Sequence, residues 1–189
     1  MAHQQPNDEK FKELVLFISE RSEGDTPFGA IKLNKLLFFI DFWSYSRFGD
    51  AVTWHEYRKL QNGPAPKRLK PLVEQLISEG RAVIVEREYF NRTLKRLIAT
   101  RSADTSKFTG RDIALATYVI HEFWGRDAAS MSRHADRFVV HWTSLELLDT
   151  IPYETALVQR GHRSEQAEKI AKELGPLARK YLGSGSATK

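Results

Sequence analysis

The sequence contains no cysteine. This absence excludes disulfide bonds, zinc sites built from cysteine, and catalysis by a thiol. A chain without disulfides is typical of a cytoplasmic protein, and we expect that location. With 189 residues, the chain is long enough to bury a hydrophobic core without disulfides or metals.

Long hydrophobic runs are also missing. No run is longer than Leu36 to Ile40, which is far too short to cross a membrane. The N-terminus, MAHQQPNDEK, is polar and has no apolar stretch of the kind that a signal peptide needs. We therefore expect no membrane partner.

The excess of charge of one sign is small. Lys and Arg number 29 against 24 Asp and Glu, so the formal net charge is +5. This value is mild for a nucleic-acid-binding protein of this size. It is compatible with an acidic protein, with RNA or with DNA as a partner, and it requires none of them.

Motifs for catalysis, cofactors and metals are absent from the sequence. There is no glycine-rich phosphate loop, no GxSxG and no Ser-His-Asp arrangement with a suitable spacing. His121, His134 and His141 lie near acidic residues, but no two histidines are spaced i, i+4 and no HExxH occurs. We expect a protein that is not an enzyme and that uses no cofactor or metal.

The composition that remains is that of a globular protein, with 41% hydrophobic and 28% charged residues. Residues 1–7 and the glycine- and serine-rich tail 183–189 have the composition of disordered ends. We therefore expect a single domain over residues 8–182.

The centre of this domain is a helix that is apolar on nearly every side. From Leu33 to Trp43 the only polar residues are Asn34, Lys35 and Asp41. Such a helix must be surrounded by other elements. A carboxylate inside it needs a partner or a raised pKa, and Lys35, an arginine of the hairpin described below, or a backbone cap are the partners we expect for Asp41.

The hydrophobic periodicity predicts a mainly helical α+β domain around this central helix, with one β-hairpin. The first predicted elements are a helix over 8–21 with Asp8 as its N-cap, the central helix over 28–48, an extended or irregular segment over 53–61, a turn over 63–66 and a helix from about 70 to 80. Strands over 82–89 and 93–100 and a helix over 109–124 follow. The remaining elements are a short helix or turn with Met131 and His134, another with Leu145, Leu147 and Leu148, a third over 152–158, and a last helix over 164–182.

The predicted hairpin carries a group of basic residues. Three helices followed by a hairpin is also the order of a winged helix, an analogy that does not fix the packing. One interpretation is a solvated hairpin, and the other is a surface for DNA or an acidic protein. The residues we expect at such contacts are Arg87, Arg92, Lys95 and Arg96.

Two ordered blocks of the sequence resemble a known family. A K-L-x-K-L-L-F-F-x-D helix is followed by a Gly, then by V-T-x-x-E-Y, and then by Gly-Pro. A His ahead of a Trp, and then Ile-Pro, form a looser second block. Together they resemble the Panacea domain, the SocA-like antitoxin family, over roughly Phe11 to Leu157. The motif positions are Lys32, Leu33, Lys35, Leu36, Leu37, Phe38, Phe39 and Asp41, then Gly49, Val52, Thr53, Glu56, Tyr57, Gly63 and Pro64, and in the second block Ser132, His134, Trp142, Ile151 and Pro152.

The resemblance implies a prokaryotic antitoxin that binds and neutralises a toxin encoded nearby. It also implies, for some members, an adaptor that hands the toxin to a protease or its unfoldase. We expect the motif residues Lys32, Lys35, Leu36, Leu37, Asp41, Gly49, Gly63, Pro64, His134 and Trp142 to be mostly structural. The alternative interpretations are a winged-helix-like DNA-binding regulator of its own operon, and a phage-associated protein that serves another partner.

Overall fold

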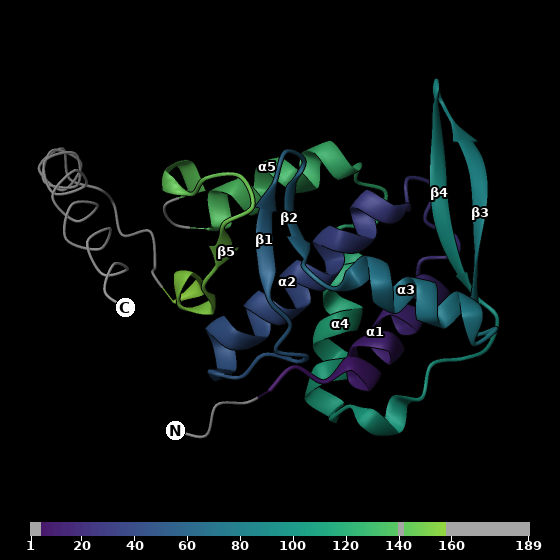
Figure 1. Ribbon diagram of the computed structural model, residues 1–189, viewed down its shortest axis with the longest axis horizontal. Coiled ribbons are helices and arrows are strands. Elements are labelled where there is room, and N and C mark those ends of the chain that lie inside the picture. The colour runs from purple at the N-terminus through teal and green to yellow at the C-terminus, as the bar shows by residue number, and fades with distance from the viewer. Residues whose placement is uncertain (1–4, 140–141, 158–189) are drawn as a thin grey trace, which may run out of the picture. The chain divides into compact units, whose positions relative to one another are not determined.

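The computed structural model describes residues 5–139 and 142–157, which form an α+β domain (Figure 1). The last predicted helix, over 164–182, the tail 183–189 and His141 lie outside the described residues. Within the described ranges, no helix combines the length and the apolar character that crossing a bilayer requires.

The first two helices have nearly the predicted bounds, with α1 at Asp8–Arg21 and α2 at Ala30–Phe48. The N-cap of α1 is Asn7 rather than Asp8, because Asn7 Oδ1 accepts the backbone N–H of Lys10 at 2.9 Å. Helix α2 ends at Gly49, whose φ of 68° places it in the left-handed region that glycine adopts without strain.

The helices predicted from about 70 to 80 and over 109–124 are present but end earlier than predicted. The segment with Met131 and His134 is a helix of 11 residues, whereas Leu145, Leu147 and Leu148 lie in a bend and a turn. Thr109 and Asp112 form a capping box at the start of α4, which explains why that helix begins where it does. The bounds are α3 at Leu69–Ser78, α4 at Gly110–Glu122 and α5 at Ala128–Phe138, with 3-10 turns η1 at Thr105–Lys107, η2 at Trp142–Ser144 and η3 at Tyr153–Ala156.

A small antiparallel sheet was not predicted. Its strands are β1 at Tyr57–Leu60, β2 at Gly63–Pro66 and β5 at Thr150–Ile151, in the order β2-β1-β5. The expectation of a turn over 63–66 is therefore wrong. The expectation of one hairpin is also wrong, because β1 and β2 form a second hairpin. Since β2 is an edge strand, its two prolines can lack N–H donors at no cost to the sheet.

The predicted hairpin is confirmed as β3 at Ala82–Tyr89 and β4 at Arg92–Ala99. Tyr89 pairs with Arg92, so a two-residue loop connects the strands. The hairpin forms a sheet of its own and rises from the helices (Figure 1). In chain order it follows α3, with β1 and β2 inserted between α2 and α3.

Helix α2 is the centre of the core, as predicted. It contacts α1, α4, α5, η3 and the strand β2 (Figure 1). Its residues from Lys35 to Phe42 are all buried. The Phe39 ring stacks on that of Phe123 from the end of α4, with centroids 4.5 Å apart. Because α2 is covered on every side from Lys35 to Phe42, each polar group in that stretch requires a partner.

Candidate functional site

The Asp41 carboxylate has no exposed surface, and it binds the segment that leads into β1. It accepts the backbone N–H of Thr53 at 2.8 Å, the Thr53 hydroxyl at 2.5 Å and the Tyr57 hydroxyl at 2.8 Å. Of the partners that the sequence suggested, only a backbone donor is present in these bonds. Neutral hydroxyls complete the set.

The environment of Asp41 alters its ionisation. Burial raises the pKa of Asp41 to about 6, although the hydrogen bonds from Thr53 and Tyr57 oppose the rise. Burial and the nearby Asp41 carboxylate raise the pKa of Tyr57 and Tyr153 well above the ordinary value. Since neither Asp41 nor Tyr57 is exposed, we assign this cluster to the fold rather than to chemistry on a substrate.

A second buried group on α2 is the Lys32 ammonium. It donates to the carbonyl oxygens of Phe123 and Arg126, at 2.8 and 2.7 Å, and it lies 2.6 Å from the carboxylate of Asp25. Burial lowers the pKa of Lys32, and Asp25 counteracts that effect. The three donors of the ammonium are satisfied, so Lys32 ties the loops before α2 and after α4 to the core.

Lys35 and Gly63 form a third contact of α2. The Lys35 ammonium donates to the carbonyl oxygen of Pro64 at 2.8 Å. Gly63 has a φ of 88°, and a Cβ there would lie 3.0 Å from Lys35 Nζ and 3.4 Å from Ser132 Cβ. The Gly63-Pro64 pair is therefore required by the close approach of a lysine and by a backbone conformation that favours glycine.

The His and the Trp of the second block of the family motif lie on two separate elements. His134 is on α5, with its ring edge-on to Phe39 and Phe123 at centroid distances of 5.4 Å. The Trp142 carbonyl in η2 accepts the Lys59 ammonium at 2.9 Å, and that ammonium also lies 5.0 Å from the centre of the Trp142 ring. In the part of the chain that the structure describes, no three His, Asp or Glu side chains are grouped as a metal site requires.

Most of the motif residues are therefore part of the interior, whereas Gly49, Glu56, His134 and Pro152 are exposed. Leu36 and Leu37 are fully buried in α2, Gly49 ends that helix, and Pro64 is buried in β2. The motif polar groups that reach the core are already bound to other parts of the chain. A site for a partner must be sought among exposed residues instead.

The basic residues of the hairpin fall into two groups. Arg96 is buried, and its guanidinium donates to the carbonyls of Ser22 and Glu23 at 3.0 and 2.9 Å, so it supports the fold rather than a contact surface. Arg87, Arg92 and Lys95 are exposed. Three of the four residues that the sequence singled out on the hairpin therefore face solvent.

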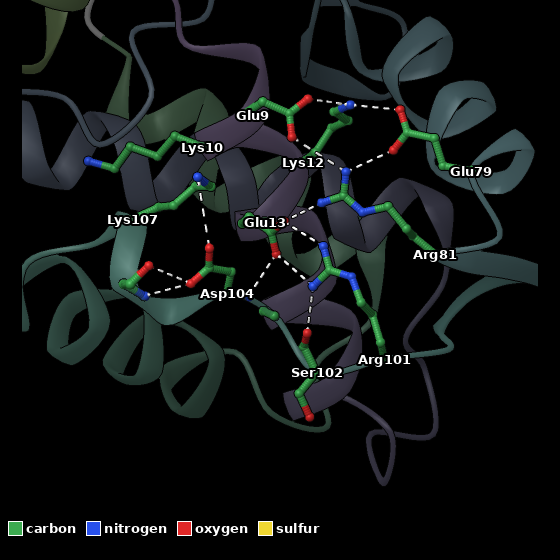
Figure 2. A network of polar contacts seen from close by, with 12 residues as sticks. Glu9, Lys10, Lys12, Glu13, Glu79, Arg81, Arg101, Ser102, Asp104 and Lys107 are labelled. Atoms are coloured by element: carbon green, nitrogen blue, oxygen red, sulfur yellow. Dashed lines mark hydrogen bonds and ion pairs between the residues drawn. The ribbon is translucent and has the colours of Figure 1, made fainter.

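The base of the hairpin is fixed by a polar network (Figure 2). At its centre the buried Glu13 carboxylate of α1 binds Arg81, Arg101 at 2.6 Å and the backbone N–H of Asp104 at 2.7 Å. Burial would raise the pKa of Glu13, but the bonds and charges of these partners lower it. The network joins α1 to both ends of the hairpin, so the hairpin is held rigidly where it leaves the helices.

A groove of about 740 Å³ lies between the hairpin tip and the first turns of two helices. The hairpin contributes Tyr89 to Lys95, and the start of α5 contributes Asp127 to Ala129. The segment before α2 and its first turn contribute Pro27 and Gly29 to Lys32. Among the apolar residues that line it, Ile31 and Phe90 are exposed. This is the candidate site for a partner.

Sequence reasoning missed most of this groove. Ile31 lies within the predicted central helix, and Phe90 lies between the two predicted strands. The groove was not predictable because it combines three segments that are distant along the chain. A large aromatic residue in a two-residue hairpin loop, where glycine or asparagine is usual, was the one available signal. Asp25, the partner of Lys32, and Glu13 were also missed, because their partners are distant in the sequence.

A search of curated proteins and a search of solved structures each gave no match. A family model described as antitoxin SocA-like, Panacea domain, matches residues 33–143, from α2 to η2. Because this match covers more than half of the chain, the protein belongs to the SocA-like Panacea domain family of antitoxins.

Proposed function

We propose that this protein is a non-enzymatic antitoxin that neutralises a toxin encoded by a neighbouring gene, through direct contact between the two proteins in the cytoplasm. The observation that carries the proposal is the family match over residues 33–143. The family is described by its antitoxin role, and an antitoxin requires a toxin as its partner.

The geometry supports binding rather than catalysis. Asp41 and Lys32, the charged motif residues that would be the first candidates for catalysis, are buried and hydrogen-bonded within the fold. The groove at the hairpin tip, by contrast, combines exposed apolar side chains with exposed cations. Such a mixture is typical of surfaces that bind another protein.

Growth of cells that express each neighbouring gene alone, and together with this protein, tests the proposal. We expect one neighbour to arrest growth, growth to return on co-expression, and the two proteins to co-purify. The proposal fails if neither neighbour arrests growth, or if growth returns although no complex can be isolated.

An extension of the same function is delivery of the bound toxin to a protease. If delivery takes place, the toxin has a shorter half-life in cells that contain this protein than in cells that lack it. An unchanged half-life together with restored growth would leave neutralisation by contact alone.

A second candidate function is binding to DNA of its own operon. It is favoured by Arg87 and Arg92, which are exposed and which form no ion pair within the described residues. A gel shift on the upstream DNA that weakens with salt, and that is lost in the double variant Arg87→Glu/Arg92→Glu but kept in Lys107→Glu, would support it. Absence of a shift at low salt would exclude it.

A further inference from the structure

The tip of the hairpin presents an aromatic side chain at an energetic cost. Phe90 is 86% exposed and has a φ of 51°, in the left-handed region that glycine prefers. Its ring lies edge-on to that of Tyr89, with centroids 4.7 Å apart. Glycine at position 90 would relieve the strain and remove apolar surface from water. A strained and exposed phenylalanine is therefore better explained by a role in binding than by stability.

The groove beside Phe90 is both apolar and positively charged. Ile31, at the start of α2, is 44% exposed. Leu94 and Gly29 also line the groove, and a Cβ at Gly29 would lie 3.5 Å from Leu94 Cβ, so the hairpin passes close to the segment before α2. Three cations line the groove, against one carboxylate. The cations are Lys32, Arg92 and Lys95, and the carboxylate is Asp127.

These charges are not equally available to a partner. Lys32 is paired with Asp25, and Asp127 Oδ1 accepts the backbone N–H of Ser130 at 2.6 Å. Lys95 lies 3.8 Å from Glu86 in an exposed pair, which contributes little. Arg92 forms no ion pair with a described residue. Its guanidinium is therefore available to a carboxylate, which it binds in a bidentate manner.

The strand register separates the charges of the hairpin between its two faces. Arg92 lies opposite Tyr89, and Arg87 lies opposite Leu94, so all four share one face. Glu86 and Glu88 lie on the other face and are exposed. Arg92 lines the groove and Arg87 does not, so an acidic segment of a protein seated in the groove meets one unpaired arginine, together with Lys95. The exposed Glu86 and Glu88 would repel a polyanion such as DNA that extends over both faces of the hairpin.

We propose that the groove binds an acidic segment of the toxin, with an apolar side chain of that segment packed between Phe90 and Ile31 and a carboxylate bound to Arg92. This inference rests on the proposed antitoxin function and assigns it a surface and a partner chemistry. Phe90 is the apolar anchor of the complex. Arg92 gives the groove its preference for an acidic segment.

Two substitutions test the groove, each with a matched control. Phe90→Gly removes the anchor and suits the backbone, so the fold is retained. Leu148→Gly is its control, because Leu148 is also exposed, has a φ of 77° and does not line the groove. Arg92→Glu reverses a charge of the groove, and Lys70→Glu reverses that of a largely exposed lysine on α3.

The probe is the toxic neighbour identified by the growth assay, with Kd measured by titration of the purified proteins. We expect Phe90→Gly and Arg92→Glu each to raise Kd by about tenfold or more, and each control by less than about twofold. Toxin variants selected to restore binding to Arg92→Glu are expected to replace Asp or Glu with a neutral or basic residue.

Three results would overturn the inference. The first is wild-type binding with both groove variants indistinguishable from their controls, which leaves the antitoxin function intact but places its surface elsewhere. The second is that all toxin variants that restore binding to Arg92→Glu replace basic residues rather than acidic ones. The third is an unchanged Kd for the toxin in Arg92→Glu while retention on upstream DNA is lost. Absence of binding and rescue by the wild-type protein would instead refute the antitoxin function itself.

Discussion

Replacing Asp41 by Asn measures the cost of keeping a carboxylate in the middle of α2. The pKa of Asp41 in the folded protein is about 6, against an ordinary value of 3.8. Below about pH 4 the group is protonated whether the chain is folded or unfolded, and the folded state then has its full stability from this site. As pH rises through about 6, the folded protein must ionise a buried group, and that stability is lost.

The magnitude follows from the size of the shift. A rise of about two pKa units corresponds to about 3 kcal/mol of unfolding free energy, since one unit is worth about 1.4 kcal/mol. Asparagine is neutral at every pH. Its amide oxygen replaces the acceptor for the Thr53 N–H, and its amide N–H groups can donate to the hydroxyls of Thr53 and Tyr57 once these rotate.

The assay is urea unfolding of both proteins at several values between about pH 4 and pH 7. Carboxylates with a lowered pKa, such as Glu13, change stability in the opposite direction, but both proteins contain them. The difference between the two free energies isolates position 41. As pH rises across this range, we expect the free energy of unfolding of Asp41→Asn to increase relative to that of the wild type by up to about 3 kcal/mol. A constant difference, or one with the opposite slope, would refute the proposed ionisation of Asp41.

Two further predictions concern the other contacts of α2. Gly63→Ala is expected to lower the free energy of unfolding by about 2 kcal/mol or more, because it adds a clash with Lys35 to the strain of a positive φ. Gly49→Ala has open space around its Cβ and is expected to cost only the strain, about 1–2 kcal/mol. Equal losses of stability for the two variants in urea unfolding would contradict the close contact at Gly63. Lys32→Met leaves the Asp25 carboxylate buried and unpaired, and it is expected to lower the free energy of unfolding by about 3–5 kcal/mol. Adding Asp25→Asn in a double variant is expected to restore part of this loss. If the losses of the two single variants are simply additive, the two residues are not coupled.

The helices and the hairpin could be predicted because their signals are local. The i, i+3, i+4 spacing of Phe11, Leu14, Val15 and Ile18 predicted α1 with its observed bounds. The same local reasoning failed for β2. Proline and glycine usually mark turns, and the sequence does not reveal that Gly63 to Pro66 forms an edge strand beside β1.

Partners of buried charges could not be predicted, because they come from distant parts of the chain. The sequence showed that Asp41 needs a partner but not that hydroxyls would supply it. It gave no sign that Lys32 meets Asp25 and two carbonyls beyond α4. The groove is harder still, since its three walls meet only in the folded chain and the positive φ of Phe90 is a property of the backbone.

Neutralisation by contact is tested most directly by titrating the purified toxin with this protein and following the activity by which the toxin arrests growth. We expect inhibition to be complete at one fixed molar ratio, equal to the ratio of the two proteins in the isolated complex. Inhibition by a small fraction of that amount would indicate turnover and an enzymatic antitoxin. Full toxin activity in the presence of excess protein would contradict the antitoxin function.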